Sequence, residues 1–161
     1  MFSNKKRDIL GIISNCKSKK RIEIAEKIAE KLNKIKHNSV NLQGGCFNTT
    51  IRGRWWRFDD LIRNYKFFFA FENSNCKDYV TEKFFHHGIQ SQSVPIVLGT
   101  DRKSYEKLAP KNSFIHVDDF RSLTELSNYM KIACVVLNSL CPSAGPGETR
   151  SGKIEANRVM Q

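Results

Sequence analysis

Five residues in a short polar stretch have side chains that suit a phosphorylated ligand carrying hydroxyl groups. Tyr79, Glu82 and Lys83 are spaced i, i+3 and i+4, which puts them on one face of a helix. In the first turns of a helix, free backbone N–H groups and the dipole favour an anion, and Lys83 adds positive charge there. Glu82 offers an acceptor for sugar hydroxyls, and Tyr79 a flat surface or a hydroxyl. Asn73 and Ser74 precede this helix and can reach a ribose, so the set predicts a nucleotide-sugar site.

Each of these residues also has a simpler interpretation when it is considered alone. A capped helix start with Glu82 and Lys83 on an ordinary solvated surface has the same residue types. The functional interpretation therefore depends on the whole set meeting in one crevice.

The elements around this stretch form a strand–helix–strand unit. An apolar run at residues 67–71 is followed by a polar loop, a helical pattern from near Asp78, and a second apolar run at residues 94–98. Two short buried strands joined by a helix are expected to be parallel. Ligands of such sheets bind at the carboxyl ends of the strands, where the polar residues lie.

A second strand–loop–helix unit precedes the first. Residues 9–13 are predicted as a buried strand, residues 14–18 as a loop, and residues 20–36 as an amphipathic helix. Arg21 lies at the start of that helix, where a guanidinium fork suits phosphate oxygens. The spacing leaves open whether Arg21 is such a clamp or one more solvated cation beside Lys17, Lys19 and Lys20.

The remaining patterns complete one α/β domain. Short strands are predicted at residues 40–42 and 114–117, and helices at residues 59–65, 104–108 and 122–132. The length of 161 residues suits one domain. We therefore predict a Rossmann-like, three-layer domain with a mostly parallel sheet. The domain is assigned to residues 1–133, and residues 134–161 to a divergent, poorly ordered tail.

The charge balance leaves a second kind of function open. Lys and Arg number 27 against 16 Asp and Glu, a formal net charge of +11, which favours an anionic partner. Trp55 and Trp56 lie among arginines, and such a segment can stack on bases or anchor a loop. Much of the excess charge lies in the first 36 residues and is interpreted as a solvated helix face, so it does not by itself indicate a basic nucleic-acid-binding domain. For Trp55 and Trp56 we favour the loop anchor. No stretch is long and apolar enough to span a membrane.

The five cysteines form no C-x-x-C pair, which argues against a zinc site. Cys16 and Cys46 both follow predicted strands near one edge of the sheet, so they are the expected disulfide in an oxidising compartment. A glycosylation sequon begins at Asn48.

Two segments resemble the signature of the alpha-1,3-fucosyltransferases, the family 10 glycosyltransferases. They are F-E-N-S-N-C-K-D-Y-V-T-E-K at residues 71–83 and V-P-I-V-L-G at residues 94–99. S-N-C-K-S-K-K-R at residues 14–21 is similar to the family's other donor-site segment, and the resemblance selects Arg21 among the cations there. The likeness extends from about residue 8 to about residue 132.

The resemblance implies the C-terminal, donor-binding half of a two-domain GT-B enzyme. The family transfers fucose from GDP-fucose to the 3-hydroxyl of N-acetylglucosamine in a glycan, with inversion. Arg21 and Lys83 would neutralise the diphosphate, and Glu82 would contact the ribose or the sugar and its developing charge. Tyr79 and Asn73 would position the nucleotide. Arg21, Lys83 and Glu82 are thus the expected catalytic residues.

The resemblance also bears on partners. Because Arg and Lys neutralise the phosphates, no metal cofactor is expected. The general base belongs to an N-terminal acceptor domain that this chain lacks. The expected partners are GDP-fucose and an N-acetylglucosamine-containing glycan, without nucleic acid, and the full-length form is expected in the Golgi membrane as a lumenal type II protein. The alternative is a fragment that binds the GDP-sugar and catalyses nothing.

Overall fold

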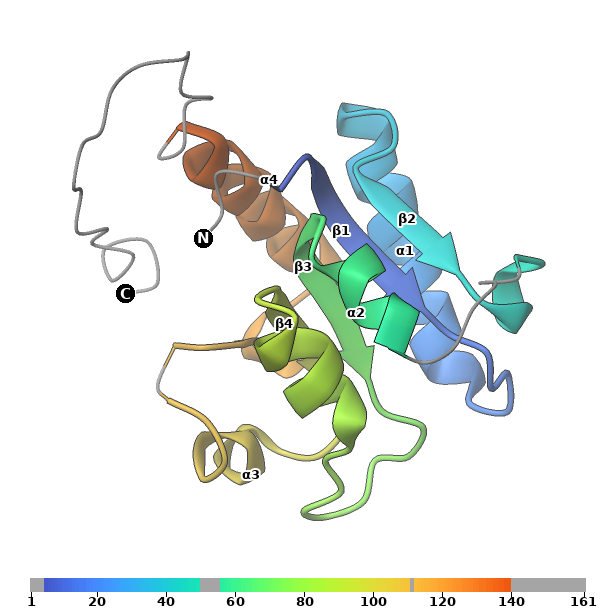
Figure 1. Cartoon of the computed structure of the whole chain (residues 1–161), viewed down its shortest axis with the longest axis vertical. Coiled ribbons are helices and arrows are strands. Elements are labelled where there is room, and N and C mark those ends of the chain that lie inside the picture. The colour runs from blue at the N-terminus through green and yellow to red at the C-terminus, as the bar shows by residue number, and fades with distance from the viewer. Residues whose placement is uncertain (1–4, 50–55, 111, 140–161) are drawn as a thin grey trace.

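The computed structural model describes residues 5–49, 56–110 and 112–139, which contain a five-stranded sheet (Figure 1). The strand order is β2-β1-β3-β4-β5, and every neighbouring pair is parallel. The strands are β1 (Arg7–Ile12), β2 (Val40–Gln43), β3 (Tyr65–Phe71), β4 (Val94–Leu98) and β5 (Ile115–His116). The parallel pairing of β3 with β4 confirms the predicted strand–helix–strand unit.

Helices cover both faces of the sheet, as a three-layer domain requires. One hydrophobic core lies between the sheet and the helices α1 (Lys19–Ile35) and α4 (Leu123–Ser139). The other core is closed by α2 (Trp56–Ile62), the π-helix η2 (Lys83–Gln90) and α3 (Arg102–Glu106). Figure 1 shows α2 in front of β3, with α1 and α4 behind the sheet.

Strand β3 is the centre of the sheet, and all seven of its residues are buried. Phe67, Phe69 and Phe71 pack into the core beneath α1 and α4, whereas Phe68 and Ala70 pack into the opposite core. Successive side chains of a strand point to opposite faces, so a strand covered on both sides must be apolar throughout. Burial of each phenylalanine contributes roughly 1.5–3 kcal/mol to the free energy of folding. The apolar run at residues 67–71 therefore stabilises both cores of the domain.

The prediction that a helix starts near Asp78 is wrong. Asp78 has a positive φ of 58°, in the left-handed region, and its N–H donates to Thr100 Oγ1 at 3.2 Å. The N–H of Thr81 donates to the carboxylate of Glu72, so residues 78–81 form a loop. The helix η2 begins only at Lys83. Tyr79 therefore lies outside the helix, and the predicted i, i+3, i+4 face does not form.

The C-terminal helix is longer than its sequence pattern indicated. Ser122 Oγ accepts the N–H of Glu125 at 3.2 Å, as expected for the cap, but α4 continues past residue 132 to Ser139. The division expected at residue 133 falls within α4. Residues 140–161, Trp55 and the last residue of the sequon lie outside the described residues. None of the helices among the described residues is long and apolar enough to cross a membrane.

A buried carboxylate joins the starts of three elements. Asp8 Oδ1 lies 2.6 Å from Lys66 Nζ, and its Oδ2 lies 2.6 Å from Lys36 Nζ. Ser39 Oγ also donates to Asp8, at 3.2 Å. Burial alone raises the pKa of Asp8, but the hydrogen bonds from Lys36 and Lys66 outweigh it and hold the pKa below its ordinary value. Asp8 on β1 therefore fixes β3 and the connection from α1 to β2.

We predict that Asp8→Asn destabilises the domain by about 3–5 kcal/mol, because it leaves the buried ammonium of Lys66 without its counter-charge. Urea denaturation gives the free energy of unfolding. Because the pKa is depressed in the folded state, this stabilisation is present above the ordinary carboxyl pKa and is lost as the pH falls through the folded pKa. The exposed pair of Glu23 and Lys27 is the control, and Glu23→Gln should leave the unfolding midpoint unchanged. Equal midpoints for the two variants would contradict the role of Asp8.

Candidate functional site

The polar loops that follow β1, β3 and β4 meet at the carboxyl edge of the sheet. Because the strands are parallel, their ends lie together, and the first turn of α1 reaches the same edge. A small hollow of about 50 Å³ opens there. Its lining residues are Ser18, Lys20, Arg21, Glu72, Ser74, Asn75, Leu98 and Gly99.

Arg21 is the most buried of the predicted site residues, with 3% of its surface exposed. Its Nη1 donates to the carbonyl of Phe71 at 3.2 Å and to Asn73 Oδ1, and its Nη2 donates to the carbonyl of Asn15. The guanidinium thus ties the loop after β1 to the end of β3. Burial lowers the pKa of Arg21, while Glu72 and Tyr79 act in the opposite direction. Its Nε is buried and meets no hydrogen-bond partner among the described residues.

Arg21 is buried, so the solvated surface cation that the sequence left open as one alternative is wrong. Its contacts are carbonyl and amide oxygens, and the described residues place no carboxylate within ion-pair distance of it. A buried cation with neutral partners keeps its charge, because arginine is not deprotonated in proteins. Arg21 therefore holds the site together and also contributes positive potential to the hollow.

Glu72 is the residue that sequence reasoning did not select for this site. Its carboxylate is buried, and it accepts the N–H of Thr81 at 2.8 Å and the hydroxyl of Thr81 at 2.7 Å. Lys83 Nζ lies 3.3 Å from the same carboxylate. Gly99 gives it room, since a Cβ at that position would come within 3.0 Å of the Glu72 side chain. Glu72 directly follows the apolar run, and a carboxylate buried there must be paired or hydrogen-bonded. Its position in the sequence was therefore the signal that could have identified it as a site residue.

Lys83 and Glu82 lie together at the start of η2, as predicted. The side chain of Lys83 is 17% exposed and its Nζ lies 3.5 Å from Glu82 Oε1. The Glu82 side chain is 59% exposed, so its carboxylate faces solvent. Burial opposes ionisation of Glu82, but its backbone hydrogen bond and Lys83 together hold its pKa below the ordinary value. An ionised acceptor and a fixed ammonium are therefore adjacent.

The other three predicted residues lie in the same loop. Asn73 is half-buried and accepts from Arg21, and Ser74 is exposed at the hollow. Tyr79 is 38% exposed and close enough to Arg21 to affect its pKa. The structure thus brings Arg21 and Ser74 to the hollow, with Asn73 bonded to Arg21. Lys83 contacts the carboxylates of both Glu72 and Glu82, and neither Lys83, Glu82 nor Tyr79 lines the hollow. Among the described residues no three His, Cys, Asp or Glu side chains gather as a metal site.

A disulfide joins Cys16 to Cys46, with Cα atoms 5.5 Å apart, as predicted. It links the loop after β1 to the 3-10 helix η1 (Gly45–Phe47) that follows β2. Cys76 is free and exposed, and Cys134 is free and buried. The loop that carries Asn15 is therefore fixed at two points, by the disulfide and by Arg21.

The model of "Glycosyltransferase family 10 (fucosyltransferase) C-term" matches residues 2–134. The chain belongs to this family. Glycoprotein 3-alpha-L-fucosyltransferase A of Drosophila melanogaster is 39% identical over 132 residues, which cover 80% of this chain and 25% of the fly protein. Human alpha-(1,3)-fucosyltransferase 4 is 48% identical over 69 residues, covering 43% of this chain and 13% of the human protein.

Solved structures agree with the family. A crystal structure of an alpha1,3-fucosyltransferase with GDP-fucose aligns with a TM-score of 0.65 at 25% identity, covering 93% of this chain and 42% of that one. A crystal structure of alpha1,3-fucosyltransferase without a named ligand aligns with a TM-score of 0.63. The family 10 resemblance and the Rossmann-like, GT-B-type domain are thereby confirmed. The chain spans a quarter of the fly relative and less than half of the solved chains.

We predict that reduction of the Cys16–Cys46 disulfide lowers the free energy of unfolding by about 2–4 kcal/mol, because the bond closes a loop across 30 residues of sequence separation. Denaturation of the wild-type chain with and without dithiothreitol measures the effect. Cys76→Ser is the control, and it should respond to the reductant as the wild-type chain does. A Cys16→Ser, Cys46→Ser double variant as stable as the oxidised chain would contradict the prediction.

Proposed function

We propose that this chain is the donor-binding part of an alpha-1,3-fucosyltransferase and holds GDP-fucose at the carboxyl edge of its sheet. The observation that carries the proposal is the convergence of two strand–loop–helix units, joined by Arg21, on one hollow with a cationic lining. The related fold solved with GDP-fucose supports the same ligand. Transfer to the 3-hydroxyl of N-acetylglucosamine in a glycan is the proposed reaction of the whole enzyme.

The diphosphate would lie against the start of α1. This helix of 17 residues has no acidic residue in its first turn, and Ser18 at its N-cap makes no side-chain capping bond. The first N–H groups are therefore open to an anion, and the helix dipole favours one. Arg21 adds positive charge from within, and Lys83 adds its ammonium from the start of η2. In this proposal these groups supply the charge that stabilises the leaving GDP, and no metal is invoked.

The reacting sugar would lie near Glu82. Inversion by a single displacement develops positive charge on the sugar and negative charge on the leaving diphosphate. The exposed, ionised carboxylate of Glu82 suits the ribose or that positive charge, while Asn73, Ser74 and Tyr79 position the nucleotide. The general base for the acceptor hydroxyl would come from the facing acceptor domain. The complete enzyme would act in the Golgi lumen as a type II membrane protein.

An alternative applies to the chain taken alone. With less than half the length of the solved enzymes, it would bind GDP-fucose weakly and catalyse nothing. A nucleic-acid role depended on net charge and the Trp55–Trp56 segment, and no described contact favours it.

We predict that Lys83→Ala and Arg21→Ala each weaken GDP binding by about 1.5–3 kcal/mol, as loss of a charge-assisted bond does. Isothermal calorimetry with GDP measures the change. Lys103→Ala is the matched control, since Lys103 is an exposed lysine on α3 outside the hollow. Arg21→Ala should also lower the unfolding temperature, because it leaves the carbonyls of Asn15 and Phe71 without their donor. Affinity that is unchanged in both folded variants would refute the assignment.

We predict that the 161-residue chain alone transfers no fucose at a measurable rate, whereas the complete protein does. A positioned general base contributes about 10²–10⁴-fold, and alignment of two substrates contributes roughly 7–11 kcal/mol. Both depend on the facing domain. The assay uses radiolabelled GDP-fucose and an N-acetyllactosamine acceptor, with Glu82→Gln as control. Turnover by the chain that disappears in Glu82→Gln would show that this part carries the base.

A further inference from the structure

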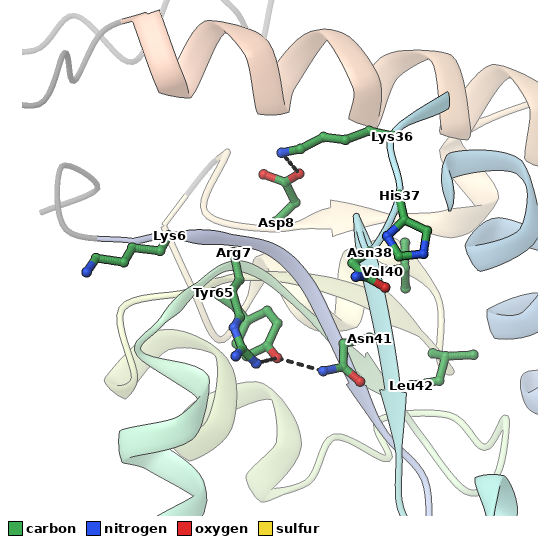
Figure 2. A pocket seen from close by; sticks show the side chains of 10 residues that line it. All are labelled: Lys6, Arg7, Asp8, Lys36, His37, Asn38, Val40, Asn41, Leu42 and Tyr65. Atoms are coloured by element: carbon green, nitrogen blue, oxygen red, sulfur yellow. Dashed lines mark hydrogen bonds and ion pairs between the residues drawn. The ribbon is translucent and has the colours of Figure 1, made fainter. Parts of the chain in front are cut away.

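A second and larger pocket lies at the amino-terminal edge of the sheet, opposite the loops of the donor site. It has a volume of about 510 Å³ and is formed where β1, β2 and β3 begin (Figure 2). Pockets of this size hold small organic ligands rather than single ions. None of the residues assigned to the donor site lines it.

One wall of this pocket is built from hydrogen-bond donors. Tyr65 Oη accepts Nη1 of Arg7 at 2.8 Å and Nδ2 of Asn41 at 3.0 Å, and Figure 2 shows both side chains converging on that hydroxyl. With both lone pairs occupied, the phenol has its proton left to donate, and it meets no acceptor among the described residues. Arg7 keeps further N–H groups beyond this bond. The wall therefore offers several donors to a ligand that carries acceptors.

The pocket is also positively charged. Lys6, Arg7 and Lys36 line it against one carboxylate, Asp8. That carboxylate is already shared between Lys36 and the buried Lys66, each at 2.6 Å. Lys6 and Arg7 form no ion pair within the described part of the chain. An anion entering the pocket thus meets uncompensated positive charge and no free carboxylate.

We propose that this pocket binds an anionic saccharide, a sugar unit that carries a sulfate, phosphate or carboxylate. Lys6 and Arg7 would bind the anionic group, since guanidinium and ammonium groups pair with such oxygens. The amides of Asn38 and Asn41 and the Tyr65 hydroxyl would bind sugar hydroxyls. A nucleotide fits less well, because Arg7 lies 5.5 Å from the ring centroid of Tyr65 and covers that ring, which leaves His37 as the uncovered ring among the lining residues. The site is independent of the donor site on the other edge.

The test is calorimetry on the complete chain with GDP present at saturation, so that the donor edge is occupied. A heparin-derived disaccharide and glucose 6-phosphate are the anionic probes, and lactose is the neutral one. Binding of either anionic probe without binding of lactose is the expected result. Comparison of the two anionic probes shows whether the pocket prefers a unit of an anionic polysaccharide or a soluble sugar phosphate. No binding by either anionic probe, or lactose binding of equal strength, overturns the proposal.

Substitutions distinguish binding in this pocket from nonspecific binding of an anion to a positively charged protein. Asn41→Asp adds a negative charge at nearly constant shape, and its carboxylate can accept the Tyr65 hydroxyl, so the fold should survive. It should weaken the anionic probe by about tenfold or more, the effect of one charge-assisted bond. Lys6→Gln removes an exposed charge and should lower the affinity for the anionic probe roughly two- to fivefold. It replaces Asn41→Asp as the test if that variant does not fold. Lys103→Gln removes a distant charge and should have no effect. Equal losses in Lys6→Gln and Lys103→Gln overturn the proposal.

Discussion

The candidate site depends on a single buried guanidinium. Arg21 starts on α1, yet its donors reach the loop after β1 and the last residue of β3. Carbonyl oxygens bond the guanidinium without cancelling its charge, so it can organise two loops and still present positive potential at the hollow. The amide of Asn73 completes the set and is held in turn by Arg21.

The loop after β3 depends on a second buried charge of opposite sign. Glu72 holds Thr81 by two bonds and lies beside Lys83, so it determines where the chain turns into η2. The charge of Glu72 raises the pKa of Arg21, although the two side chains form no direct ion pair among the described residues. The carboxyl edge of the sheet is therefore built around a cation and a carboxylate that each bond mainly to neutral groups of the neighbouring loops.

The sequence predicted the elements better than the site geometry. The apolar runs at 9–13, 67–71 and 94–98 indicated the strands because buried parallel strands are apolar on both faces, and Cys16 and Cys46 were paired because both follow strands. The helix start was misplaced because it depends on hydrogen bonds that the N–H groups of Thr81 and Asp78 donate to Glu72 and Thr100, which lie outside the helix pattern. The burial of Arg21 depends on the carbonyls of residues 15 and 71, and backbone atoms leave no signal in a residue pattern. The pocket at the amino-terminal edge was not predicted, because its lining residues come from the starts of three strands that are far apart in the sequence.

The two edges of one parallel sheet thus have different chemistry, and amide NMR distinguishes them directly. The most direct measurement is a titration of the ¹⁵N-labelled chain with GDP, followed residue by residue. We expect the amides of Asn15, Arg21 and Asn73 to shift, together with those at the start of η2, while those of Arg7 and Asn41 stay fixed. Shifts concentrated at Arg7 and Asn41, with the loops tied by Arg21 unperturbed, would contradict this expectation.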